Sequence, residues 1–308
     1  MMSNNNWIEI PVFIHGITPE ENPGSHDLQY DILYANIQAA LKVHNKPTFK
    51  VPPIKIEWGW RNPNSARMVE QDQYLADVER AVARQALAVE ANIWDFTLNP
   101  ARLVHKELRK AFLFGFADLL YYASKDGEAT VRRHVFKDIV TGVNQYITES
   151  QKKISLTIVG HSAGSLIAHD LLYHLFGKDK ISDFPEVREL RKLADGEQPR
   201  LRVRRFYTIG SPITPLTFRS NALIKKNLTN SQLNPNDIGL RFDNTLSNPR
   251  WLNIWDKDDI ASFPVSFLYE NTAGVVKDQY VDLGDVFPPV HNIYWTNAQV
   301  AKQIAETF

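Results

Sequence analysis

Residues 154–176 constrain the fold of this chain more than any other segment. Residues 154–159 form a short, β-branched, apolar run that is typical of a buried strand. The sequence Gly160-His161-Ser162-Ala163-Gly164 then leads directly into a run with an apolar stripe at helical spacing, which ends at Phe176. A strand that turns into a helix within so few residues is half of a β-α-β unit, and such units build parallel sheets.

The rest of the chain continues this alternation of strands and helices. Strands are expected over 8–14, 54–58, 201–209 and 251–255, with one or two more within 275–283, and helices over 28–43, 163–176 and 297–308. The alternation predicts an α/β fold with a mostly parallel central sheet and helices on both faces. Since no linker interrupts the sequence, residues 1–308 are interpreted as a single domain.

A long helical region separates the second strand from the third. Residues 65–150 are rich in Ala, Leu, Glu and Arg, and helices are expected at about 70–80, 81–95, 100–123 and 129–150. This is more helix than one crossover needs, so roughly 62–135 is predicted to be a helical insertion or cap. Its aromatic-rich run, 111–123, is expected to pack in the core, and a pocket lining or lid is the alternative.

The composition excludes several kinds of site. The chain has no cysteine, which rules out disulfides, thiolate metal sites, iron–sulfur clusters and a cysteine nucleophile. A formal net charge of zero gives no basis for binding nucleic acid. The N-terminal residues do not form a signal peptide, and no run reaches the roughly 20 apolar residues of a transmembrane segment. A cytoplasmic protein is therefore expected.

Ser162 is the candidate nucleophile. A Gly-x-Ser-x-Gly sequence between a strand and a helix is the context of a nucleophile elbow, a tight and strained turn. Strand and helix approach so closely there that the residues two before and two after the serine must be very small, as Gly160 and Gly164 are. The helix N-terminus also favours developing negative charge. The alternative is an ordinary strand–turn–helix corner with a capping serine.

His291 is the candidate general base, which a serine hydroxyl needs near neutral pH. The chain has nine histidines, and the hydrolase order of serine, acid and histidine selects His291. His169 and His174 follow Ser162 too closely, on the helix that leaves the turn. The alternative for His291 is a surface loop histidine with no chemical role.

The candidate acid is one of three aspartates that follow the strand at 251–255. Asp256 is expected to lie too close to the strand. Asp258 is preferred, because residues 258–261 resemble the Asp-x-hydrophobic-small pattern found after this strand in many hydrolases. Asp259 is the alternative acid. A carboxylate at this point would orient the imidazole and stabilise its protonated form.

Acyl transfer also requires two backbone N–H donors for the oxyanion. The amide of Ala163, directly after the nucleophile, is expected to be one of them. The other is expected after the first strand, where the sequence His15-Gly16-Ile17 leaves the backbone free to turn its amides inward. Ile17 is the preferred donor of the pair and Gly16 is next.

These segments together resemble the α/β-hydrolase superfamily, on its esterase and lipase side. The segment Gly115 to Tyr122 is similar, less specifically, to lipase-like bacterial hydrolases with helical insertions. Because the early strand starts near residue 8, the first two strands of the full eight-stranded sheet are expected to be absent. The resemblance implies a Ser-His-Asp triad, a covalent acyl-enzyme, no metal and no cofactor. The matching segments are those at 12–17, 156–167, 208–212, 251–255 and 291–295.

The expected activity is hydrolysis of a small-molecule or lipid ester through an acyl-enzyme on Ser162. A thioesterase, amidase or acyltransferase would use the same triad. A third possibility is a non-catalytic hydrolase-fold protein whose helical insertion binds a partner.

Overall fold

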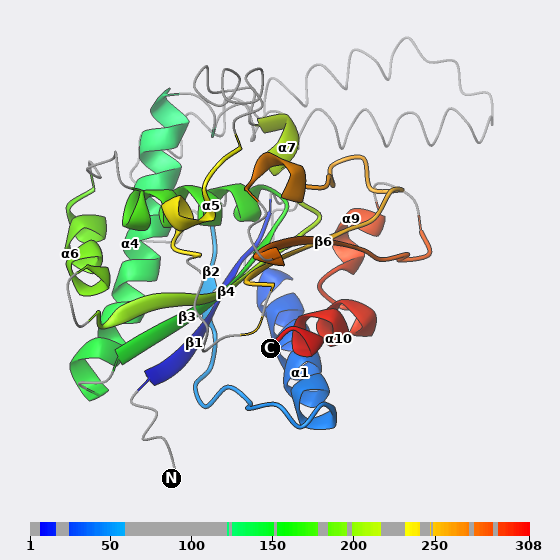
Figure 1. Ribbon diagram of the computed structural model, residues 1–308, viewed down its shortest axis with the longest axis horizontal. Coiled ribbons are helices and arrows are strands. Elements are labelled where there is room, and N and C mark those ends of the chain that lie inside the picture. Colours follow the sequence, from blue (N-terminus) through cyan, green and yellow to red (C-terminus); the bar gives the residue numbers. More distant parts are fainter. Residues whose placement is uncertain are drawn as a thin grey trace.

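Six parallel strands form the centre of the described part of the chain (Figure 1). They are β1 (Trp7–Ile14), β2 (Ile54–Ile56), β3 (Lys153–His161), β4 (Leu201–Ile209), β5 (Trp251–Trp255) and β6 (Val276–Tyr280). The computed structural model describes residues 7–16, 25–58, 122, 125–150, 153–177, 184–195, 199–216, 232–240, 247, 249–270, 274–285 and 289–308.

The strand order is β2-β1-β3-β4-β5-β6, so the direction of winding reverses between β1 and β3. From β1 the chain moves outward to β2, and from β3 it moves the other way through β4 and β5 to β6. The connections that leave β1 and β3 therefore diverge. In open parallel sheets the ligand crevice lies outside the carboxyl ends of the strands at such a reversal. In this chain those ends carry Gly16 and Ser162.

Helices cover both faces of the sheet, as Figure 1 shows. One face carries α4 (Lys125–Ser150), α5 (Ala163–Phe176) and α6 (Pro185–Ala194), and the other carries α1 (Ser25–Val43), α9 (Val290–Ile293) and α10 (Ala298–Glu306). Further short helices are α7 (Ile213–Leu216), η2 (Pro235–Ile238) and η3 (Ser266–Leu268). None of the helices in the described ranges is long and apolar enough to cross a membrane.

Alternation along the strands divides the core between these two layers. On β1, Ile10 and Val12 belong to the cluster under α4 and α5, whereas Phe13 belongs to the cluster under α1 and α10. On β3, Ile158 and Val159 divide in the same way. Successive side chains of a strand point to opposite faces, so a sheet that is covered on both sides needs apolar residues at nearly every position.

The expected α/β class is confirmed, and so are the strands expected near 8–14, 54–58, 154–159, 201–209 and 251–255. One strand, β6, forms within 275–283. The end of the range predicted to be an insertion belongs to α4, where Val135 joins the core. The helices expected at 70–80, 81–95 and 100–123 lie outside the described residues, apart from Tyr122.

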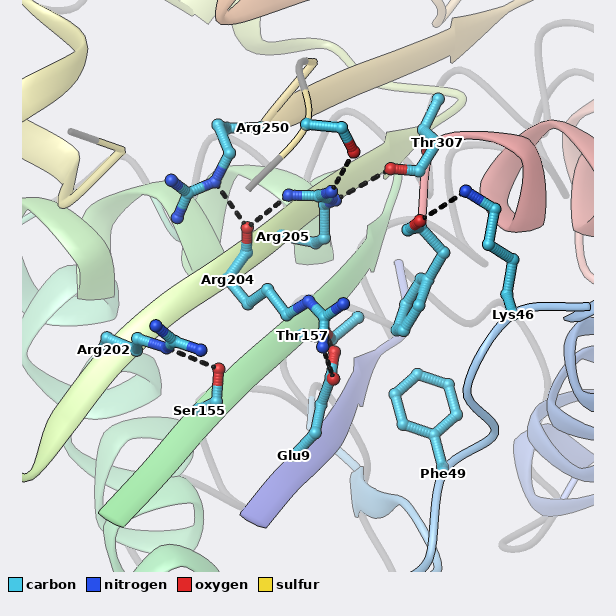
Figure 2. A network of polar contacts seen from close by, with 12 residues as sticks. Glu9, Lys46, Phe49, Ser155, Thr157, Arg202, Arg204, Arg205, Arg250 and Thr307 are labelled. Atoms are coloured by element: carbon cyan, nitrogen blue, oxygen red, sulfur yellow. Dashed lines mark hydrogen bonds and ion pairs between the residues drawn. The ribbon is translucent and has the colours of Figure 1, made fainter. Parts of the chain in front are cut away.

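Buried arginines join chain segments in the amino-terminal halves of the strands, here called the amino edge of the sheet (Figure 2). Arg205 donates hydrogen bonds to the carbonyl oxygens of Thr307 (3.0 Å) and Arg204 (3.2 Å), and to the hydroxyl of Ser247 (2.9 Å). Arg250, just before β5, also donates to the Arg204 carbonyl, at 2.7 Å. These bonds join the middle of β4 to the start of β5 and to the end of α10.

Candidate active site

The carboxyl ends of the parallel strands, here called the carboxyl edge of the sheet, carry the candidate nucleophile. Ser162 lies there at the point where the strand order reverses. β3 ends at His161 and α5 begins at Ala163, so Ser162 alone forms the turn. Its backbone has φ 51° and ψ −129°. A residue with a side chain is strained in this region by about 1–3 kcal/mol, and it persists there only where the surrounding structure holds it.

Two glycines make this turn possible. A Cβ atom at Gly160 would lie 2.6 Å from the Cα of Ser165, in the first turn of α5. At Gly164 a Cβ atom would lie 2.4 Å from the carbonyl oxygen of Ile14 and 2.2 Å from that of His15. No larger residue fits either position. Strand and helix therefore approach each other as closely as the motif predicts.

The backbone that follows β1 lies directly against the candidate nucleophile. A Cβ atom at Gly16 would be 2.4 Å from the Cβ of Ser162 and 3.0 Å from its Oγ. Only glycine can bring a main chain this close to the serine. The expected second oxyanion donor, Ile17, lies outside the described residues, and Gly16 is the last described residue before it.

The imidazole of His15 fixes the conformation of this backbone. The ring stacks on Trp58, with centroids 5.8 Å apart, and accepts a hydrogen bond at Nε2 from the Trp58 amide at 3.1 Å. Its Nδ1 donates to the carbonyl of Gly16. With one nitrogen accepting and the other donating, the ring is neutral. Burial lowers the pKa of His15 well below its ordinary value, and the neighbouring His26 lowers it further.

His291 and Asp259 form a hydrogen-bonded pair at the same edge. The Nδ1 of His291 lies 2.8 Å from Oδ2 of Asp259, whose side chain is fully buried. The other carboxylate oxygen of Asp259 accepts a hydrogen bond from the Ala261 amide at 3.0 Å. His291 sits on the short helix α9, and its side chain is 17% exposed.

The structure places the alternative acid, Asp259, against His291, and it does not bring the preferred residue, Asp258, to that imidazole. Asp258 instead pairs with Lys257 at 2.6 Å, and its side chain is 38% exposed. The local turn is the cause. The Asp256 side chain accepts a hydrogen bond from the Asp258 amide at 2.9 Å, which stabilises a tight turn. The side chain of the next residue, Asp259, therefore points back towards the sheet and His291. Asp256 also accepts from the Leu283 amide at 2.7 Å, so its role is structural.

The pair of His291 and Asp259 lies beside the turn that carries Ser162. A Cβ atom at Gly210 would be 3.3 Å from Cε1 of His291 and 3.2 Å from Oδ2 of Asp259. Gly210, with φ 58°, directly follows Ile209, whose carbonyl accepts a hydrogen bond from the Ser162 amide at 3.0 Å. The end of β4 therefore contacts the serine on one side and the imidazole–carboxylate pair on the other.

The sequence gives no signal for a second histidine of this site, His161, because it occupies the variable position of the Gly-x-Ser-x-Gly sequence. His161 Nε2 lies 2.6 Å from the carbonyl oxygen of His291, and the two rings are 4.7 Å apart. Burial lowers the pKa of His161 well below its ordinary value, and the nearby His291 lowers it further. A neutral His161 donates to the His291 carbonyl and so braces the backbone that carries the imidazole.

No protein-family model and no curated protein matches this chain. The geometry of the site is therefore the basis on which a function is assigned.

Proposed function

We propose that this chain is a serine hydrolase of the α/β-hydrolase type that cleaves carboxylic esters through an acyl-enzyme on Ser162. The observation that carries the proposal is the hydrogen bond between the buried Asp259 and His291, at the edge where Ser162 occupies its strained turn. A capping serine in an ordinary corner has no need for this combination, because neither strain nor an imidazole–carboxylate pair contributes to capping.

In the proposed reaction, Nε2 of His291 accepts the hydroxyl proton of Ser162 while Oγ attacks the carbonyl carbon of the ester. The tetrahedral intermediate collapses, its bond to the alcohol oxygen breaks, and His291 returns the proton to the leaving alcohol. Water then repeats the sequence on the acyl-enzyme and releases the carboxylic acid. Asp259 orients the imidazole through Nδ1 and stabilises its positive charge.

The proposed oxyanion donors are the amide of Ala163 and an amide of the backbone after β1. Ala163 is the first residue of α5, where the amide has no acceptor within the helix and the helix dipole favours an anion. Contact between Gly16 and Ser162 supports the second donor, since it places that backbone against the reacting oxygen. Ile17 is retained as the second donor.

The position of Ser162 in the sheet supports the α/β-hydrolase type. The serine follows the strand next to the reversal of strand order, where ligands bind in open parallel sheets. In the described part of the chain, β1 is paired with β2 on one side and with β3 on the other. No described strand precedes β1, in keeping with the expected hydrolase sheet without its first two strands. In this proposal roughly 62–135 is a helical insertion or cap, of which the described residues include only Tyr122 and the start of α4.

A fluorophosphonate probe tests the proposal directly, because it reacts with an activated serine and not with an ordinary one. We expect the wild-type chain to be labelled on the peptide that contains Ser162, and the Ser162→Ala variant to remain unlabelled. Equal labelling of both would exclude Ser162 as the nucleophile. A folded wild-type chain without label would favour the non-catalytic, partner-binding alternative.

The class of substrate needs a second measurement, on wild-type enzyme that has not been treated with the probe. We expect turnover of p-nitrophenyl esters of short and medium acyl chains to exceed turnover of the matching thioesters and anilides. Faster turnover of thioesters or anilides would assign the same triad to a thioesterase or an amidase.

A further inference from the structure

We propose that Ser165 and Ser211 are positioning residues, which hold the amide of Ala163 in the direction that oxyanion binding requires. The inference rests on the proposed hydrolase function. Both hydroxyls belong to side chains that are fully buried beside the candidate nucleophile, Ser165 in the first turn of α5 and Ser211 two residues after β4.

The two hydroxyls form a chain of hydrogen bonds with one direction. Ser165 Oγ donates to the carbonyl oxygen of Ser162 at 2.5 Å and lies 2.7 Å from the Oγ of Ser211. A serine hydroxyl has a single proton, so the bond between the two serines is donated by Ser211. The amide of Ile213 donates in turn to Ser211 Oγ at 3.3 Å. The chain of donors thus begins at the start of α7 and ends on the carbonyl of the nucleophile.

The end of this chain determines the direction of one peptide group. In a planar trans peptide the carbonyl of Ser162 and the N–H of Ala163 point in opposite directions. The Ser162 carbonyl receives two hydrogen bonds from Ser165, from its amide at 3.0 Å and from its hydroxyl at 2.5 Å. Both donors draw the carbonyl towards the first turn of α5, so the Ala163 N–H is directed away from that turn.

The hydroxyls matter because the turn is strained. Any residue other than proline at position 165 would supply the hydrogen bond from the backbone amide, whereas only a side-chain donor supplies the second bond to the same oxygen. A strained backbone keeps its conformation only where several contacts specify it. Ser211 also connects the turn to the acid, because its carbonyl accepts a hydrogen bond at 3.0 Å from the amide of Phe263, four residues after Asp259.

Substitution of each serine by alanine tests the proposal. The measurements are kcat and KM for an ester that the wild-type enzyme hydrolyses, together with inhibition by a boronic acid, whose tetrahedral adduct mimics the oxyanion. For Ser165→Ala we expect kcat to fall by about 10–100-fold, since a misdirected donor loses part of the 10²–10³-fold that a missing donor costs. KM should change by less than about twofold, because the interaction forms only in the transition state.

Ser211→Ala leaves the bond from Ser165 to Ser162 in place, so its effect should be smaller, about 3–10-fold in kcat. The double variant should match Ser165→Ala, because both hydroxyls act through one carbonyl. The inhibition constant of the boronic acid should rise in parallel with the loss of kcat/KM. Ser155→Ala is the matched control, because this equally buried serine lies near the amino end of β3, and it should leave kcat and inhibition unchanged.

The failure of this inference is distinguishable from the failure of the proposed function. A wild-type chain that no phosphonate labels removes the hydrolase and this role together. A labelled wild type, with Ser165→Ala labelled at the same rate and equally sensitive to the boronic acid, overturns the positioning role alone. If Ser165→Ala does not fold, Ser211→Ala decides, since unchanged kcat and inhibition in that variant would equally overturn the role.

Discussion

The two edges of the sheet both bury charged and polar side chains, but they arrange them differently. At the amino edge, Arg205 and Arg250 donate to backbone carbonyls and thereby join chain segments (Figure 2). At the carboxyl edge, Ser162, His291 and Asp259 lie around a strained turn and glycine backbones. Burial of polar groups alone therefore does not mark a site. A hydrogen-bonded imidazole–carboxylate pair beside a strained serine turn distinguishes the carboxyl edge.

The acidic residue of each edge illustrates the same difference. Glu9, at the amino edge, pairs with Arg204 and accepts a hydrogen bond from Thr157 at 2.6 Å. Burial nevertheless raises the pKa of Glu9, against the lowering effect of Arg204. Asp259, at the carboxyl edge, faces an imidazole instead of a guanidinium. An imidazole can gain and lose a proton near neutral pH, whereas a guanidinium keeps its proton.

The largest expected effect comes from the acid of the carboxyl edge. Asp259→Asn should lower kcat/KM by about 10⁴-fold, because an amide stabilises the wrong tautomer of His291. Asp258→Asn, its neighbour in sequence, should change kcat/KM by less than about threefold, since the Asp258 side chain is partly exposed and pairs only with Lys257 in the described structure. Ester hydrolysis by the two purified variants makes the comparison. Equal losses would mean that the turn after β5 is arranged differently.

A buried arginine of the amino edge should affect stability and leave catalysis intact. Arg205→Met would leave the carbonyls of Thr307 and Arg204 and the hydroxyl of Ser247 without this donor. The Arg204 carbonyl keeps its hydrogen bond from Arg250, and Ser247 is exposed to solvent. We therefore expect the free energy of unfolding to fall by about 1–3 kcal/mol, the cost of leaving one buried acceptor unsatisfied.

Urea unfolding measures the stability of this variant. Titration of Ser162 with a phosphonate gives the concentration of active sites, and the rate of ester hydrolysis divided by that concentration gives kcat, which should equal the wild-type value. Lys257→Met, at an exposed lysine of the carboxyl edge, is the control and should change stability by less than about 0.5 kcal/mol. A loss of kcat per active site in Arg205→Met would contradict the separation of the two edges.

The smallest expected effect is a dependence of stability on pH that originates at the carboxyl edge. Burial lowers the pKa values of His15 and His161 well below 6.5. Below pH 6.5 the unfolded chain protonates these histidines while the folded chain keeps them neutral, so the unfolded state binds more protons and stability falls as the pH falls. Each histidine contributes at most about 1.4 kcal/mol per pH unit.

Urea unfolding at pH 7.5 and 5.5 measures this dependence. His15→Gln should reduce the difference between the two free energies of unfolding by about 1.4 kcal/mol. Glu9→Gln should not reduce this difference, because a raised pKa affects stability in the opposite direction. The stability that protonated Glu9 contributes is lost as the pH rises above 4.5. A reduction in the Glu9→Gln variant would place the titration at the amino edge.

Much of this arrangement follows from local sequence patterns. The β-branched runs and the helical stripes define β1, β3, β4, β5, α1 and α5 because their periods depend only on neighbouring residues. The sequence around Ser162 predicts the tight turn for the same reason, since the small residues that it needs lie within two positions. The proposed acid illustrates the limit, because Asp258 and Asp259 are adjacent and equally acidic.

Local sequence predicts a parallel α/β sheet with Ser162 at the end of a strand, followed by His291 in the order serine, acid, histidine. Three contacts depend instead on the packing of the folded chain: that of Asp259 with His291, that of His161 with the His291 carbonyl, and that of Ser211 with Ser165. The physical reason is that side-chain direction in a turn, and contact between the ends of different strands, depend on residues far apart in the chain.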